Sequence, residues 1–470
     1  MTVDPSIFRG YDLRGLVGSQ LNEETVALLG KGYATWLLER RIYDCVIGYD
    51  CRLSSPLYRD ILARELNDAG ITVYDIGMTL TQIVYFACYY FRTRGMIMIT
   101  ASHNPKEYNG FKFGTGFSET MLTEDIIELR DLVNSGNFKT RNPKGKLIKK
   151  DIKQDYMDDL KKRIDPIRKF KVVVDSCAAT TGIYLPDILR SVGCEVIEQN
   201  TKPDGNFPAG VADPTDYEVQ TRLANRVIKE NADIGFSYDT DGDRIGIVDG
   251  KGRLIWNDVL VALFAKDVIN ALPGSKIVFN TLCSKIVEDS IMKAGGKPVM
   301  WKTGHSFIKA KIREERAPFG GELSGHIYFV DNFYGHDDGA IATLRLLAYL
   351  TRVNKTLDQA VDELPKYISS PEIKLGLADN IKFKLIDEKI SQDLRNLFPS
   401  AKYVDIDGFR ADTTDEMVII RASQNGPYIT VKFEGKTQEQ YDGLKVKLAG
   451  ILRKYPEIDW KKGVNIHAFE

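Results

Sequence analysis

Compact apolar runs alternate with segments of helical periodicity along the first 150 residues of the chain. The clearest helical segment begins at Asn22, a capping residue, and Val26, Leu29 and Tyr33 follow at helical spacing. Strands are expected at 45–49, 72–76 and 96–99, and helices at 22–40, 54–69 and from 82. Alternating strands and helices predict an α/β domain.

The same alternation restarts twice further along the chain. Strands are expected at 171–175, 195–197, 234–238, 276–279 and 298–301, helices at 181–192, 218–230 and from 258, 284 and 306, and a hairpin at 245–255. From about residue 366 the pattern is that of an α+β domain, with strands expected at 371–375, 417–421 and 428–433 and helices at 385–397 and 439–455. We therefore expect three similar α/β domains at 1–152, 153–255 and 256–366, and a smaller α+β domain at 367–470.

Composition indicates which kinds of binding partner the protein has and in which compartment it is found. The 470 residues include 64 basic and 65 acidic side chains, and this balance predicts neither a nucleic-acid nor a membrane partner. Apolar runs stay well below the ~20 residues of a membrane span, the six cysteines form no C-x-x-C pair, and the first residues lack signal-peptide features. We therefore expect a cytoplasmic protein with reduced cysteines. Four of the five histidines lie in polar, glycine-rich loops, which indicates that they contribute to a functional site. These are His103, His305, His326 and His336.

A polar loop follows the apolar run at 96–99. It contains Ser102 and His103, and Lys112 follows after a Tyr-Asn-Gly bend. A turn at the end of a buried strand is expected to display its serine rather than bury it, so the loop could present a nucleophilic or phosphate-carrying hydroxyl to a cleft. Ser-His-Asn-Pro is also an ordinary turn composition, and both interpretations stay open on this loop alone.

Three carboxylates, Asp239, Asp241 and Asp243, follow the expected strand at 234–238. Alternating carboxylates offer hard oxygen ligands to a divalent cation, and without one they would repel each other. An EF-hand does not fit, because position six of the loop would be Arg244 and position twelve Gly250. The pattern favours a metal site over the alternative, a solvated acidic turn.

The loop at 320–326 places polar side chains between glycines. Glu322 and Ser324 could bond vicinal hydroxyls of a polyhydroxy ligand, and His326 could exchange a proton near neutrality. Upstream, His305 could either cap a helix or face the same ligand. A plain glycine-rich bend is equally compatible with the pattern.

A further polar loop lies between two expected strands of the last domain. Arg421, Ser423 and Asn425 supply a guanidinium, a hydroxyl and an amide beside a glycine, which are the parts of a phosphate clamp. A hairpin turn without a ligand remains the alternative. The chain has no Walker A motif, dinucleotide-binding glycine pattern or zinc-ligand spacing, which removes the commonest nucleotide and zinc interpretations.

The order of these four loops, one in each expected domain, resembles the α-D-phosphohexomutase superfamily. The resemblance covers nearly the whole chain and is closest to the bacterial phosphomannomutase/phosphoglucomutase branch. It is carried by residues 11–15, 102–112, 239–246, 301–309, 321–326 and 335–339. It implies mixed sheets in the three α/β domains and a central cleft between all four domains.

The resemblance also implies a role for each loop. Ser102 would be a phosphoserine, and one of its phosphate oxygens would join Asp239, Asp241 and Asp243 around Mg²⁺. Proton transfer and charge stabilisation would fall to Arg14, Lys112 and His326, with Arg244 near the phosphoserine. The substrate would be held by His305, Glu322 and Ser324 at the sugar and by Arg421, Ser423, Asn425 and Thr430 at the distal phosphate.

The implied activity is interconversion of hexose 1-phosphate and hexose 6-phosphate, with mannose, glucose or both as the sugar. Phosphate would pass from Ser102 to the free hydroxyl, giving a hexose 1,6-bisphosphate that is both intermediate and activator. Such transfer depends mainly on positioning and charge neutralisation. The resemblance leaves the choice between monomer and homodimer open.

The chain also departs from the family pattern at several positions. The phosphate loop reads Gln424-Asn425-Gly426, Thr81 precedes Gln82 where a proline is frequent, and Leu282 stands where some bifunctional members have a lysine. Two rival functions are a metal-dependent phosphosugar phosphatase and a non-catalytic phosphosugar-binding protein. The phosphate clamp argues against the first, and the presence of Ser102, the three aspartates and Lys112 argues against the second.

Overall fold

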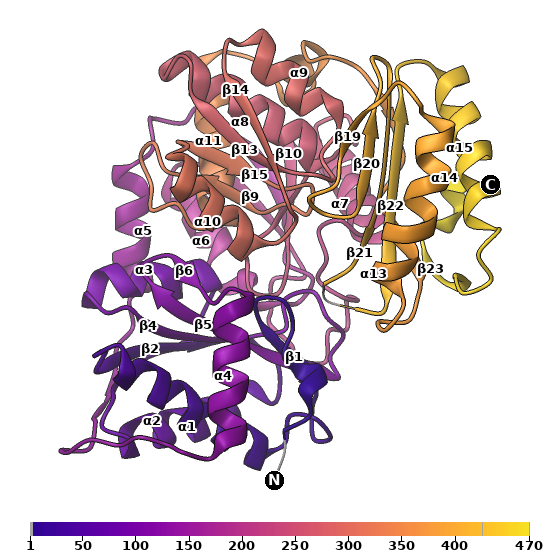
Figure 1. Ribbon diagram of the computed structural model, residues 1–470. Helices are drawn as coiled ribbons and strands as arrows, with labels where there is room; N and C mark the ends of the chain where they lie inside the picture. Colours follow the sequence, from indigo (N-terminus) through magenta and orange to yellow (C-terminus); the bar gives the residue numbers. More distant parts are fainter. Residues whose placement is uncertain (1–2, 425, 470) are drawn as a thin grey trace.

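Four β-sheets organise the chain in the computed structural model, which describes residues 3–424 and 426–469. The first three sheets are flanked by helices, and the fourth belongs to the C-terminal domain beside them (Figure 1). In Figure 1 the N-terminal domain lies at the bottom, the third at the top and the C-terminal domain at the right. The fold is therefore three α/β/α domains and a sheet-rich fourth domain, as the sequence predicted.

The first sheet has the strand order β1-β5-β4-β2-β3-β7, with β6 paired to β5. Strand β2 runs parallel to β3 and β4, whereas β5 runs antiparallel to β4 and β1. The strands are β1 (Leu13–Leu16), β2 (Asp44–Tyr49), β3 (Thr72–Met78), β4 (Gly95–Ile99), β5 (Tyr108–Gly116), β6 (Glu119–Thr120) and β7 (Leu147–Lys149), and the helices are α1 (Glu23–Glu39), α2 (Ser55–Asp68), α3 (Thr81–Phe91) and α4 (Thr123–Ser135).

The second sheet has the order β12-β11-β10-β8-β9, and the third the order β14-β13-β15-β16. The second domain contains β8 (Lys171–Asp175), β9 (Glu195–Gln199), β10 (Ile234–Tyr238), β11 (Ile245–Asp249), β12 (Leu254–Ile255), α5 (Lys153–Lys162), α6 (Leu185–Ser191) and α7 (Tyr217–Glu230). The third contains β13 (Lys276–Asn280), β14 (Lys297–Trp301), β15 (Phe319–Gly321), β16 (Ile327–Phe329), α8 (Asn257–Ala271), α9 (Lys285–Lys293), α10 (His305–Glu315), α11 (Gly339–Arg352) and α12 (Leu357–Asp362).

The fourth sheet has the order β19-β20-β21-β22-β18-β23, with β17 paired to β22, and its pairs are antiparallel. Its elements are β17 (Ile368–Ser369), β18 (Ile373–Gly376), α13 (Lys382–Leu385), a π-helical turn at Ile386–Ile390, α14 (Ser391–Leu397), β19 (Lys402–Val404), β20 (Phe409–Asp412), β21 (Glu416–Ala422), β22 (Tyr428–Gly435), α15 (Gln438–Leu452) and β23 (Asp459–Val464).

Each candidate loop joins two antiparallel neighbours of its sheet. The serine loop joins β4 to β5, the aspartate loop joins β10 to β11, the glycine-rich loop joins β15 to β16, and the phosphate loop joins β21 to β22. The first three domains thus place the same hairpin at the cleft. Similar architecture brings loops that are far apart in sequence to one place.

One hydrophobic core runs through the first three domains, the first domain has a second core of its own, and the fourth domain has a separate core. Strand β21 contacts two of these cores, because Met417 and Ile419 face the shared core while Val418 and Ile420 face the fourth domain's own core. The alternation of side chains along a strand explains this double contact. The fourth domain is therefore attached by one sheet face.

Most expected elements are confirmed within one to three residues, and α1 begins after Asn22, whose Oδ1 accepts a hydrogen bond from Thr25 N at 2.8 Å. The single helix expected at 181–192 is wrong. A 3-10 turn at Thr180–Ile183 precedes α6, whose second residue is Pro186, so the α-helical ladder begins only there. Helix α11 was not expected. Among the described residues, no helix is long and apolar enough to cross a membrane.

Candidate active site

Ser102 lies between β4 and β5 with a left-handed backbone (φ 48°). Its side chain is fully buried and lies against Asp239 of the second domain, so the expectation of a displayed serine is wrong. Ser102 Oγ donates a hydrogen bond to Asp239 Oδ2 at 2.6 Å and lies 3.3 Å from His103 Nδ1. The hydroxyl thus faces the carboxylates of the second domain.

Arg52 holds this loop in place, and sequence reasoning missed it. Its guanidinium is 1% exposed and is paired with Asp50. Four further hydrogen bonds go to loop carbonyls, from Nη1 to Pro105 O (2.8 Å) and Tyr108 O (3.0 Å) and from Nη2 to Ser102 O (2.8 Å) and Asn104 O (2.7 Å). No local pattern could have identified this role of Arg52, because the loop carbonyls that it binds lie about 50 residues away in sequence.

The three aspartates that follow β10 are all fully buried, and one oxygen from each lies within 4.8 Å of the others. Lys112 donates hydrogen bonds to Asp241 Oδ2 at 2.7 Å and to Asp243 Oδ2. Burial first, and then the charges of Asp241 and Asp243, raise the pKa of Asp239 well above its ordinary value. The site therefore concentrates negative charge that a single ammonium group balances only in part.

This site fits a divalent cation that prefers oxygen ligands. The Oδ1 atoms of Asp241 and Asp243 are buried without a hydrogen-bond partner, and a cation would satisfy both of them. Thr81 Oγ1 donates to Asp241 Oδ2 at 2.5 Å, which orients that carboxylate. Thr81 thus contacts the site although the family's following proline is absent.

Arg244 and His326 connect the second and third domains beside Ser102. Arg244 Nε donates to His326 Nε2 at 3.0 Å, and the guanidinium lies 3.9 Å from Asp239 Oδ2. Arg14 donates to Asn104 Oδ1 of the serine loop at 2.6 Å and pairs with Asp12 at 2.8 Å. Arg14 thus contacts the serine loop, and Arg244 contacts both His326 and the carboxylate that accepts from Ser102.

The glycine-rich loop fixes its carboxylate firmly. Glu322 Oε2 accepts from Gly304 N at 2.9 Å and Oε1 accepts from Tyr328 Oη at 2.7 Å, and burial raises the pKa of Glu322. His305 is the first residue of α10, whereas Gly304 occupies the cap position, so His305 faces the cleft instead of capping the helix. Its ring lies edge-on to Tyr11, with centroids 4.8 Å apart.

Arg421 at the end of β21 is buried and oriented by Asp407 Oδ2, to which its Nε donates at 2.9 Å. Asp407 Oδ2 also accepts from Thr303 N at 2.9 Å, so this carboxylate links the fourth domain to the third. Lys374 on β18 lines the same cavity and was not expected from the sequence. Thr430, in contrast, lies on β22 outside the lining residues, and Asn425 lies outside the described residues.

These loops enclose a cavity of about 70 Å³ at the meeting point of the four domains. This volume is far below the roughly 300–1,000 Å³ typical of small-ligand sites. The sequence-predicted residues on its walls are Arg244, His305, Glu322, Ser324, His326, Arg421 and Ser423. The described conformation is therefore a closed cleft.

Three family models match the chain: "Phosphoglucomutase/phosphomannomutase, alpha/beta/alpha domain I" over residues 5–140, domain II over 154–252 and domain III over 256–367. A phosphomannomutase/phosphoglucomutase of Pseudomonas aeruginosa is 36% identical over 452 residues, which are 96% of this chain and 96% of the relative. The chain belongs to the phosphoglucomutase/phosphomannomutase family.

Other members of the family agree with this assignment. A phosphoglucomutase of Neisseria gonorrhoeae is 32% identical over 460 residues, covering 98% of this chain and 99% of the relative. The crystal structure of a phosphoglucomutase/phosphomannomutase family protein from Burkholderia thailandensis has a TM-score of 0.88 at 32% identity, covering 96% of this chain and 98% of that chain. The likeness extends over all four domains.

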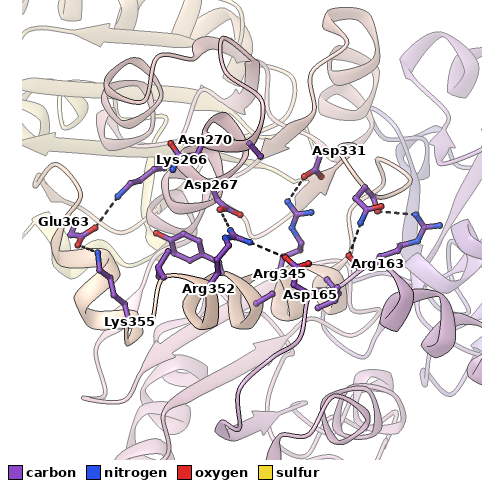
Figure 2. A pocket seen from close by; sticks show the side chains of 16 residues that line it. Arg163, Asp165, Lys266, Asp267, Asn270, Asp331, Arg345, Arg352, Lys355 and Glu363 are labelled. Atoms are coloured by element: carbon purple, nitrogen blue, oxygen red, sulfur yellow. Dashed lines mark hydrogen bonds and ion pairs between the residues drawn. The ribbon is translucent and has the colours of Figure 1, made fainter.

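A larger hollow of about 520 Å³ lies away from the cleft, between α8 and α11 (Figure 2). Its charged side chains are paired with each other: Arg345 lies 2.6 Å from Asp331, Lys266 lies 3.2 Å from Glu363, and Arg352 contacts Asp267. Each cation of the hollow is already paired with a carboxylate, so a phosphorylated ligand would have to displace an ion pair. The smaller cavity between the domains is the one that the sequence-predicted polar loops line.

Proposed function

We propose that the chain is a phosphohexomutase that interconverts the 1-phosphate and 6-phosphate of mannose, glucose or both. The observation that carries this proposal is the position of Ser102, whose Oγ lies 2.6 Å from Asp239 within a buried group of three aspartates and Lys112. Family membership supports the same activity.

In the proposed reaction, Ser102 carries a phosphoryl group that passes to the free hydroxyl of a bound hexose phosphate. The sugar oxygen forms a bond to phosphorus, the bond to Ser102 Oγ breaks, and the product is a hexose 1,6-bisphosphate. The proton of the sugar hydroxyl passes to His326 Nε2. The bisphosphate then turns within the cleft, and its other phosphate returns to Ser102.

The remaining residues position the reactants and neutralise charge. Asp239, Asp241 and Asp243 would hold Mg²⁺, which neutralises the phosphoryl oxygens when bound. Lys112 adds a positive charge at the same place, and Arg244 would move from His326 to the phosphoryl group, which frees Nε2.

At the far end of the cleft, Arg421 and Ser423 would hold the distal phosphate, with Asn425 and Thr430 as further proposed contacts. His305, Glu322 and Ser324 would contact the sugar. Because the closed cavity is small, the fourth domain would have to move to admit the substrate, and its separate core makes such a movement feasible. We propose domain boundaries near residues 152, 255 and 366.

The test supplies glucose 1-phosphate or mannose 1-phosphate with Mg²⁺ and a trace of hexose 1,6-bisphosphate, and follows the 6-phosphate. We expect isomerisation by the wild-type chain and none by Ser102→Ala. Release of inorganic phosphate without isomerised sugar would replace the mutase by the phosphatase alternative. Full activity of Ser102→Ala would refute the phosphoserine.

A further inference from the structure

A buried polar network lies behind His326, on the side away from Arg244. Its centre is Asp337, in the segment between β16 and α11, with a fully buried side chain. Asp337 Oδ2 lies 2.9 Å from His326 Nδ1 and 3.9 Å from His305 Nδ1, and Oδ1 lies 3.4 Å from Lys309 Nζ. Lys309 Nζ also donates to Tyr85 Oη of α3 at 2.5 Å. The network therefore joins the first and third domains at the imidazole.

The partners of His326 determine which of its nitrogens carries the proton. A guanidinium has donors but no acceptor, so His326 Nε2 must accept the hydrogen bond from Arg244. A neutral imidazole that accepts at Nε2 carries its proton on Nδ1, the atom that lies 2.9 Å from Asp337. In this structure the Nδ1–H group of His326 does not point directly enough at Asp337 Oδ2 to form a hydrogen bond. Such contacts commonly tighten when substrate binds.

Asp337 is suited to accept a hydrogen bond from this N–H group while it stays ionised. Burial by itself would raise the pKa of Asp337, but Lys309 and then His326 outweigh burial and hold the pKa well below its ordinary value. A carboxylate that faces the Nδ1–H of an imidazole fixes both the tautomer and the ring orientation, and leaves Nε2 as the basic nitrogen.

We propose that Asp337, held by Lys309, is the positioning residue of His326 and keeps Nε2 directed at the reacting sugar hydroxyl. This inference rests on the proposed mutase function. It adds a group that touches neither substrate nor the aspartates of the proposed Mg²⁺ site. The network also explains why a lysine and a carboxylate are buried together behind the cleft.

A metal ion is the rival explanation for the same atoms. Single ligand atoms of Asp243, His326 and Asp337 lie within 4.8 Å of one another, and imidazole nitrogen and carboxylate oxygen are both zinc ligands. A neutral imidazole that binds a metal at Nδ1, however, carries its proton on Nε2. The contact with Arg244 requires Nε2 to be unprotonated, because Nε2 accepts the hydrogen bond that Arg244 Nε donates. The observed contacts thus favour a proton over a metal.

Asp337→Asn provides the test. Lys309 can only donate, so it should attract the amide oxygen and turn the amide NH₂ toward His326 Nδ1. The imidazole would then accept at Nδ1 and carry its proton on Nε2, the wrong tautomer. We expect kcat to fall at least about tenfold and up to ~100-fold with little change in KM, the loss known when an outer partner of a functional imidazole is removed.

The tautomer is measured directly by ¹⁵N NMR of the histidine rings, assigned with a His326→Asn variant. We expect Nδ1–H in the wild-type chain and Nε2–H in Asp337→Asn. The matched control is Asp338→Asn, which changes the adjacent buried carboxylate; Asp338 caps α11 and accepts from Tyr156, and asparagine also caps helices. This control should keep both the tautomer and kcat.

Three outcomes would overturn the inference. The first is Nε2–H in the wild-type chain, which needs no variant to fold. The second is unchanged kcat and tautomer in Asp337→Asn. The third is stoichiometric Zn²⁺ binding that Asp337→Asn abolishes and Asp239→Ala retains. Absence of isomerisation by the wild-type chain would instead refute the proposed function, and the NMR result would still decide the orientation of His326.

Discussion

The Arg52→Lys variant would keep the positive charge but would lose hydrogen bonds that hold the serine loop in place. The five N–H groups of the Arg52 guanidinium match five acceptors, one of them a carboxylate oxygen of Asp50 and four of them loop carbonyls. Lysine has three N–H groups on one nitrogen, so at least two acceptors lose their donor. At roughly 1.5–3 kcal/mol for each hydrogen bond from a charged donor, the loss is about 3–6 kcal/mol before the loop rearranges.

The loop would rearrange because Ser102 has a left-handed backbone that Arg52 stabilises. A shift of ~1 Å in a reacting group costs about 100-fold in rate, so we expect kcat of Arg52→Lys to fall by about that factor. The assays are thermal unfolding, the mutase reaction, and hydrogen exchange of amides 100–108.

Arg59→Lys is the matched control. Arg59 lies on α2 with a 15% exposed side chain, and it pairs with Asp75 at 2.6 Å, away from the serine loop. A lysine can keep this ion pair and has no contact with the serine loop, so the control should lose less stability than Arg52→Lys and keep its kcat. If Arg52→Lys unfolds at the wild-type temperature and keeps its kcat, the support assigned to Arg52 is wrong.

Further predictions concern the metal, the distal phosphate and a buried acid. Chelation of divalent cations should abolish isomerisation and Mg²⁺ should restore it; activity that survives chelation would contradict the metal site. Lys112→Met leaves Asp241 and Asp243 without their ammonium partner, so the variant should depend more on Mg²⁺ to neutralise these carboxylates. Its unfolding temperature should therefore fall more in EDTA than in Mg²⁺, and equal losses would show that Lys112 and the metal do not neutralise the same carboxylates. Arg421→Lys loses bidentate binding and should raise KM for the hexose phosphate about tenfold with a smaller effect on kcat; an unchanged KM would exclude the clamp. Burial raises the pKa of Asp338 from 3.8 to about 7, so the folded state keeps a proton that the unfolded state loses near pH 4. Stability should therefore fall as pH rises from about 4 to 7, and a thermal unfolding series in which Asp338→Asn has the same slope as the wild type would refute this assignment.

The serine and aspartate loops could be predicted because their chemistry is local. Asp239, Asp241 and Asp243 alternate along one short segment, and a strand ending in such a loop is visible in the sequence. Burial of Ser102 could not be predicted, because the atoms that cover it come from other domains.

The supporting residues were hidden for the same reason. Lys309 and Asp337 lie in segments that carry the family resemblance, but no pattern within those segments shows that they contact each other and His326. The loop carbonyls that bind Arg52 lie about 50 residues from it in sequence. Helix α11 was missed as well. The boundary of α6 depended on where the 3-10 turn ends.

By itself, the sequence determined the α/β alternation, the change of pattern near residue 366 and the four polar loops, because periodicity and turn chemistry act over a few residues. Only the tertiary structure decided that each loop is the hairpin of its own sheet, that the four hairpins meet, and that Ser102 is buried against Asp239. It also decided the environment of His326, since Arg244 and Asp337 reach the two ring nitrogens from different parts of the fold. Packing between domains, which no local pattern records, sets these contacts.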